Sequence, residues 1–165
     1  MNPFPFIFAL GWIIAILHLL LSRQPATKAR IIEILLLYQL VFTVGLGGLF
    51  AFYGHAFLSN EIAEYIGWPP GNPFQLEVAY ANLSFGILGL LCIWFRGLFW
   101  AATIIGLSIW FWADAYEHLR QLMVYQNEAP GNAGLPLYTD IIVPIILIAL
   151  LTGYLYGQAN KQGLS

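Results

Sequence analysis

The stretch LFWAATIIGLSIWFWADAYEH, residues 98–118, is an apolar run that acquires ionisable side chains only where it ends. A run of about 20 such residues is long enough for an α-helix to cross the hydrocarbon core of a bilayer. In a helix, Asp114, Glu117 and His118 stand at i, i+3 and i+4 and therefore share one face. Lipid cannot solvate ionisable groups, so we expect this face to contact protein, water or a bound cation.

The apolar character extends over the whole chain of 165 residues, of which 60% are hydrophobic and 8% charged, with a mean hydropathy of +0.76. These values are typical of a polytopic membrane protein and leave no room for a separate soluble domain. The predicted fold is an all-α integral membrane protein, a five-helix transmembrane bundle that forms one domain over residues 1–165. The expected spans cover residues 4–21, 31–53, 73–95, 98–118 and 139–156. The chain has no phosphate-binding loop and no basic patch, so nucleic acid is not an expected partner.

The connection between the second and third spans is predicted to be structured. Ser59 is a plausible N-cap for a short helix over residues 60–66, and Gly67 is its expected end. The apolar face of this interfacial helix would lie against lipid headgroups, with Ile62, Tyr65 and Ile66. Asn72 is the expected N-cap of the third span, with Gln75 as its capping-box partner.

Small residues predict where helices approach closely. They occur in the second span (Gly45, Gly47, Gly48), in the third, where one polar residue joins them (Asn82, Gly86, Gly89), and in the fifth (Gly153, Gly157). The last pair offers a face for a homodimer. The very short turn at 96–97 predicts a tight antiparallel hairpin of the third and fourth spans. His18 and Glu33 are interpreted as a structural pair.

The basic residues predict the orientation of the chain. With five spans, Arg23, Lys28, Arg30, Arg96 and Lys161 fall on one side, and only Arg120 falls on the other. The positive-inside rule makes the first side cytoplasmic, so the N-terminus is expected outside and the C-terminus in the cytoplasm. Seven of the eight acidic residues lie at or beyond the outer ends of the helices, and only Glu33 lies inside.

The outer ends of four spans are expected to bring together six candidate ligands for a cation or a proton: His55, Glu77, Asp114, Glu117, His118 and Asp140. Carboxylates and imidazoles together suit first-row transition metals, and a divalent metal would be held by Asp114, His118, Glu77 and His55. Closely spaced carboxylates would instead favour binding of a proton. The alternative is that each side chain simply reaches water at the end of its span.

Three further residues are candidates for a polar pocket beneath this site: Asn82, Gln39 and Trp110. For the two amides the alternative is a hydrogen bond between helices, and for the tryptophan a place in the aromatic belt or the core. Trp110 could also form one wall of a site for a flat or lipid-like ligand such as a quinone.

The run GWPPGNPFQLEV at residues 67–78, followed by Ala81-Asn82-Leu83 and Gly86, resembles the signature of a family of small, uncharacterised bacterial inner-membrane proteins. More distantly, the chain is similar to the DoxX-like group of compact helical membrane proteins, which usually have four spans. The resemblance covers chiefly the second connection and the third span. It implies a multi-pass helical bundle in the bacterial inner membrane and brings no activity with it.

Two classes of function remain open from the sequence. The first is a non-enzymatic component of the lipid bilayer that binds or relays a cation or proton at its periplasmic end, as a homo-oligomer or as a subunit of a larger membrane complex. The second is a membrane enzyme that uses a metal or a quinone, with Asp114, His118, Glu77 and His55 as ligands or acid/base groups.

Overall fold

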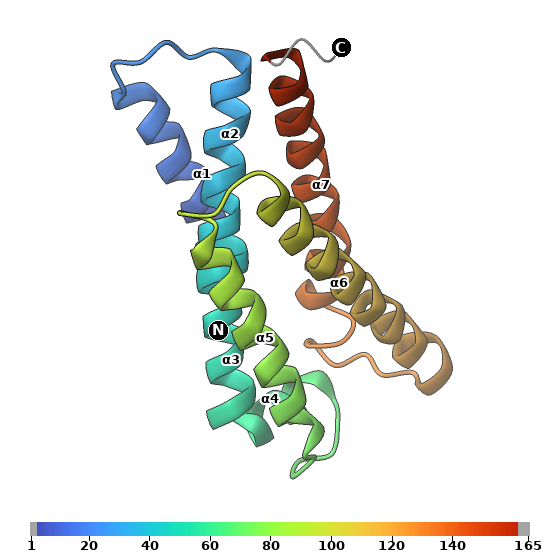
Figure 1. Cartoon of the computed structure of the whole chain (residues 1–165). Coiled ribbons are helices and arrows are strands. Elements are labelled where there is room, and N and C mark those ends of the chain that lie inside the picture. Colours follow the sequence, from blue (N-terminus) through green and yellow to red (C-terminus); the bar gives the residue numbers. More distant parts are fainter. Residues whose placement is uncertain (1–2, 162–165) are drawn as a thin grey trace.

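The computed structural model describes residues 3–161, with side chains as far as Asn160, and every regular element in that range is helical (Figure 1). In chain order the elements are α1 (Phe4–Leu21), α2 (Lys28–Gln39), the π-helical segment η1 (Leu40–Leu46), α3 (Gly47–Phe57), α4 (Ser59–Ile66), α5 (Phe74–Leu91), α6 (Leu98–Tyr125) and α7 (Leu135–Lys161). Because α2, η1 and α3 follow one another without a break, residues 28–57 form one span. The described chain thus has 5 helices long and apolar enough to cross a membrane, which confirms the predicted all-helical, multi-pass class.

The fourth span is longer than the sequence predicted. We expected it to end at His118, where ionisable residues gather, but α6 continues to Tyr125 and ends at Gln126, which has a positive φ of 56°. The side chains of its last turns pair with one another along the helix: Glu117 accepts hydrogen bonds from Arg120 and Gln121 at i+3 and i+4. Such pairs stabilise a helix, so polar residues at this end prolong α6 instead of ending it.

The helices pack in two groups. α3 and η1 pack on α5, while α6 packs on α7, and α7 in turn packs on α2. The expected tight hairpin of the third and fourth spans is wrong, because α5 and α6 share a short connection but then diverge (Figure 1). This divergence leaves space between the two groups at the α4 end of the molecule.

Glycines permit the close packing of η1 and α3 on α5, as the sequence predicted. A Cβ atom on Gly48 would lie 2.9 Å from the Cα of Gly86, and one on Gly89 would lie 2.8 Å from the Cα of Gly45. The backbones can therefore approach only because these positions carry no side chain. Gly153 and Gly157 of α7 likewise permit close packing of α7 on α2. A Cβ on Gly153 would meet Ile32 of α2 at 3.1 Å, so this face, offered above for a homodimer, packs inside the protein.

The opposite end of the bundle holds the apolar core. Its buried residues come from α2, η1, α6 and α7, together with Cys92: Leu36, Leu40, Val44, Cys92, Trp100, Ile104, Leu107, Val143, Leu147, Leu151 and Tyr154. Near this end Arg96 pairs with Glu33 of α2 at 2.5 Å. His18 instead has Nδ1 at 2.9 Å from the hydroxyl of Tyr38, so the predicted pairing of His18 with Glu33 is wrong.

Trp100 is expected to be important for stability. Its side chain is fully buried, its Nε1 donates to the Cys92 carbonyl at 2.9 Å, and its ring lies 4.9 Å from that of Tyr154. Trp100→Phe removes the donor, leaves a buried carbonyl unpaired and creates a void, so we expect a loss of about 2–3 kcal/mol in the free energy of unfolding. Trp112→Phe is the matched control, because Trp112 is 44% exposed, and it should cost under about 0.5 kcal/mol. Denaturant unfolding in detergent measures both, and equal losses would contradict the assignment.

The two long connections are joined to each other at the α4 end. The Gly131 N–H donates to the Tyr65 carbonyl at 2.9 Å, and Asn127 Nδ2 donates to the Ile66 carbonyl at 2.9 Å. As predicted, α4 ends at Gly67, which has a φ of 83°. Its apolar residues Ile62, Tyr65 and Ile66, for which contact with lipid headgroups is predicted, all line a cavity. The short helix therefore covers the space between the two helix groups.

Candidate functional site

A cavity of about 480 Å³ lies between the two helix groups at the α4 end. This volume falls within the range of small-molecule sites. Its walls are mainly apolar and include an aromatic cluster, in which Phe85 stacks on Trp110 at 5.4 Å and Phe111 packs edge-on against Trp110 at 5.6 Å. Five of the six predicted cation ligands line this cavity: His55, Asp114, Glu117, His118 and Asp140. Within the described chain its lining includes no Lys or Arg.

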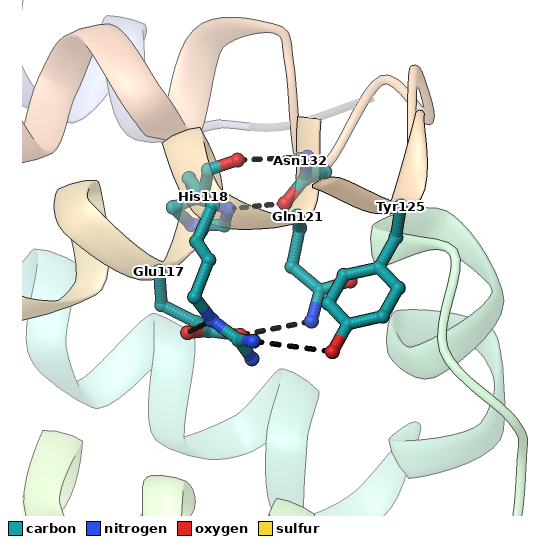
Figure 2. Close-up of polar contacts among 6 residues, drawn as sticks. Glu117, His118, Gln121, Tyr125 and Asn132 are labelled. Carbon is teal, nitrogen blue, oxygen red and sulfur yellow. Dashed lines mark hydrogen bonds and ion pairs between the residues drawn. The ribbon is translucent and has the colours of Figure 1, made fainter. Parts of the chain in front are cut away.

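His118 is held in a defined orientation by Asn132, which is fully buried (Figure 2). The Asn132 amide nitrogen donates to the carbonyls of His118 and Asn127, at 3.2 and 2.8 Å. Carbonyls only accept, so these two bonds fix which way the amide points, and its oxygen lies 2.9 Å from His118 Nδ1. An amide oxygen also only accepts, so Nδ1 must carry a hydrogen. His118 Nε2 is therefore the nitrogen that carries the lone pair when the ring is neutral.

Asp140 of α7 faces this free nitrogen. Its Oδ2 lies 3.6 Å from His118 Nε2, and the two side chains are 14% and 15% exposed. A lone pair on Nε2 and an ionised carboxylate would repel each other at this distance. One proton on either group would convert this repulsion into attraction.

Asp114 brings a second carboxylate to the same wall. It is half-buried, and it lies close enough to Asp140 for their negative charges to repel each other. No hydrogen bond or ion pair within residues 3–161 engages its carboxylate. Two carboxylates without a Lys or Arg among the lining residues make this wall attractive to a positive charge.

Glu117 lines the edge of the cavity but is already neutralised. Its carboxylate accepts two hydrogen bonds from Arg120, both at 2.7 Å, and one from Gln121 at 2.8 Å, and Arg120 also reaches the Tyr125 hydroxyl at 3.2 Å (Figure 2). This bidentate pair satisfies the carboxylate. Of the three ionisable residues that share one face of α6, only Asp114 and His118 are free to engage a ligand.

His55 lies in the other helix group. Its Nδ1 is 2.6 Å from Oε1 of Gln75 on α5, and Gln75 is 2% exposed. Gln75 was expected to be a capping-box partner of Asn72. Its side chain instead holds His55, while Asn72 Oδ1 accepts from the Phe74 N–H at 2.9 Å. Both cavity histidines thus have Nδ1 bonded to a buried side-chain amide.

The other predicted site residues have different places. Glu77 is exposed and does not line the cavity. Gln39 is buried between Thr43, at 2.6 Å, and α1; with its nitrogen facing Thr43, its oxygen accepts from Trp12 Nε1 at 3.2 Å. It links two helices outside the cavity. Asn82 and Trp110 do line the cavity, and Asn82 Nδ2 donates to the Val78 carbonyl at 3.0 Å in its own helix.

The predicted metal centre is not formed. Among the residues that the structure describes, no three His, Cys, Asp or Glu side chains come together as a ligand group. The reason is the arrangement above: His55 points to Gln75, Glu77 is outside, and only Asp114, His118 and Asp140 share a wall, where His118 faces Asp140 from 3.6 Å.

Comparison with known proteins places the chain in a family. The family model described as "Family of unknown function (DUF6790)" matches residues 1–159. The chain belongs to DUF6790. This agrees with the expectation of an uncharacterised family, while similarity to the DoxX-like group is not shown. No curated protein and no solved structure matches the chain.

Two residues of this DUF6790 site were not among the sequence candidates. Gln75, predicted to be a capping-box residue, and Asn132 hold the two cavity histidines. One sequence signal was available. Pro-Gly-Asn occurs at 70–72 and at 130–132. Gln75 follows the first of these turns by three residues, and Asn132 is the last residue of the second. Only the folded chain shows which imidazole each amide meets.

Proposed function

We propose that this chain is a small membrane protein that binds a proton or a small organic cation in the cavity at the α4 end. His118 and Asp140 hold the proton between them, and Asp114 adds the second negative charge. The observation that carries the proposal is the fixed orientation of His118, whose Nδ1 is bonded to Asn132 at 2.9 Å and whose Nε2 faces Asp140. If His118 only reached solvent at the end of its helix, water could bond its ring nitrogens. The fully buried side chain of Asn132 instead fixes the imidazole in one orientation.

The orientation of the chain belongs to the same proposal. The positive-inside rule favours an α4 end that faces away from the cytoplasm. The resemblance described above implies a bacterial inner membrane, and in that membrane this end would face the periplasm. The cavity would then take its proton or cation from outside the cell. In this proposal the protein binds the proton or cation without catalysing a reaction. If the proton or cation then passed to a partner subunit or to another group of the same chain, the site would act as a relay.

An organic cation tests the acidic wall directly. We expect octylammonium to bind the purified protein at least tenfold more tightly than octanol, its neutral counterpart, and we expect Asp114→Asn to remove most of this preference. A charge pair near a protein surface is worth about 4 kcal/mol at ~4 Å, so a tenfold effect is a conservative expectation. Competition binding in detergent micelles, corrected for protein-free micelles, measures both ligands.

Glu77→Gln is the matched control for this experiment, because it also removes a carboxylate at the same end of the molecule but outside the cavity. It should leave the preference for octylammonium unchanged. Equal binding of the amine and the alcohol by the unmodified protein would refute a cation site. An equal loss in the Glu77 and Asp114 variants would show that only general surface charge attracts the amine.

A further inference from the structure

A second, smaller hollow of about 210 Å³ lies between the first turns of α1 and α7 and adjoins the cavity. Phe4 and Thr139 line both spaces, so the cavity and the hollow meet at these two side chains. Asp140, the next residue of α7, lines the cavity, so the acidic wall begins beside this junction. The hollow thus extends the candidate site from the acidic wall toward the outside of the bundle.

The hollow reaches the surface that the spanning helices present to lipid. α1 and α7 are two of the helices long and apolar enough to cross a membrane. On α7, Tyr138 and Ile142 stand at i and i+4, line the hollow and are 58% and 48% exposed. Apart from Thr139, the residues that line the hollow are apolar or aromatic: Phe4, Pro5, Phe8, Leu135, Tyr138, Ile142 and Val143. An alkyl chain can therefore lie in the hollow with its end in the bilayer.

The cavity itself is larger than a proton or an ammonium group requires. Its volume of about 480 Å³ lies in the range of sites for drug-sized ligands. Apart from the acidic wall it is mainly apolar, and Phe85, Trp110 and Phe111 form the aromatic cluster described above. A positive charge at Asp114 and Asp140 leaves this apolar space unfilled unless the same molecule carries hydrocarbon.

From these observations we propose that the ligand of the cavity is a single-chain organic cation that enters from the bilayer between α1 and α7. Its cationic group lies at the carboxylates of Asp114 and Asp140, and its alkyl chain passes Phe4 and Thr139 into the hollow. Charge selects this molecule over a neutral lipid chain, because the described lining of the cavity includes these carboxylates and no Lys or Arg. The inference rests on the proposed function and adds the class of the cation and its route.

The test compares octylammonium with butylammonium, which has half the chain, on a protein whose hollow is filled. Ile142→Trp places a large side chain in the hollow at a partly exposed position, so the core need not move. We expect the substitution to weaken octylammonium binding about tenfold, since each methylene that loses its apolar surroundings costs about fourfold and about two are displaced. Butylammonium should bind within about twofold of its affinity for the unmodified protein, because its shorter chain stays in the cavity.

Ile145→Trp is the matched control, because Ile145 lies on the same helix, is 55% exposed and lines neither the cavity nor the hollow. It should leave the affinities for both amines unchanged. Competition binding in detergent micelles measures both, and the ratio between two proteins in the same detergent cancels uptake of the amine by the micelles. Equal effects of the two substitutions on octylammonium, or an equal loss of butylammonium with Ile142→Trp, would overturn the proposal.

A photoreactive octylammonium locates the chain without any substitution. With a diazirine on its terminal carbon, illumination should label residues 135–143 of α7 or residues 4–8 of α1, as mass spectrometry of the peptides detects. An excess of unmodified octylammonium should suppress this labelling. Label on the aromatic cluster instead would show that the chain folds back within the cavity, which contradicts the proposed route.

The cation site and the route fail in different ways. If octylammonium shows no preference over octanol, the cation site is wrong and the present inference falls with it. If the preference is present but Ile142→Trp acts no differently from Ile145→Trp, the cation site stands and entry between α1 and α7 is refuted.

Discussion

Gly89→Ala is expected to lower the free energy of unfolding by about 3 kcal/mol. The added Cβ would lie 2.7 Å from the Leu40 carbonyl oxygen and 2.8 Å from the Cα of Gly45. Both are backbone atoms of η1, so no side chain can turn aside, and η1 must move away from α5. Thermal and denaturant unfolding in detergent measure the loss.

Gly106→Ala provides the control for this prediction. Its added Cβ would lie 3.4 Å from the ring of Phe85, an ordinary contact with a side chain. Replacing Gly by Ala within a helix also favours folding by about 0.5–1 kcal/mol, so this variant should be neutral or slightly stabilised. If both variants proved equally stable, the close approach of η1 to α5 would be incorrect.

Asn132→Leu is expected to cost about 3 kcal/mol and to release His118. The substitution leaves the carbonyls of His118 and Asn127 without the amide nitrogen that bonds them, and it removes the acceptor for His118 Nδ1. Each buried group left unpaired costs about 1–3 kcal/mol, partly offset by the apolar replacement. The freed imidazole can then adopt the other tautomer, so we also expect the preference for octylammonium to fall.

Asn72→Leu is the comparison that separates the two effects. Asn72 occupies the same place in the other Pro-Gly-Asn turn, but its oxygen bonds only the Phe74 N–H, at 2.9 Å. The N-cap of α5 is Pro73 and not Asn72 as predicted, so Asn72→Leu loses only this one turn hydrogen bond, which should cost about 1 kcal/mol and leave ligand binding unchanged. If Asn132→Leu behaved no differently from Asn72→Leu, Asn132 would be an ordinary turn residue.

The class of fold could be predicted from sequence because long apolar runs have few alternatives. A run such as residues 98–118 must be helical in a membrane, where every backbone polar group needs a partner within the segment. The glycines also indicated correctly where η1 and α3 approach α5. These inferences depend on local composition, which the sequence displays directly.

Pairing between helices could not be predicted in the same way. The short turn at 96–97 shows only that the end of α5 lies near the start of α6. It does not show that α5 packs on α3 and η1 while α6 packs on α7, so the expected hairpin was wrong. The end of α6 also differs from the prediction, because Glu117 and Arg120 pair along the helix and prolong it instead of marking its end.

The candidate site was predicted in part, for a physical reason. Asp114, His118 and Asp140 are ionisable residues in apolar helices, and such residues are conspicuous because burial is costly. Glu77 has the same sequence signal but faces outward, since its orientation depends on the rotation of α5. Gln75 and Asn132 carry no comparable sequence signal, because amides are common in turns. Their importance lies in contacts with residues 20 and 14 positions away along the chain.

The central claim, that Asn132 holds His118 so that Nε2 shares a proton with Asp140, is tested most directly by nitrogen-15 NMR of protein labelled at histidine. The chain has only 3 histidines, so His118 can be assigned with a single His118→Gln variant. We predict that neutral His118 carries its hydrogen on Nδ1 and that Asp140→Asn changes the Nε2 signal. A neutral His118 with its hydrogen on Nε2, or an Nε2 signal unaffected by Asp140→Asn, would contradict the account.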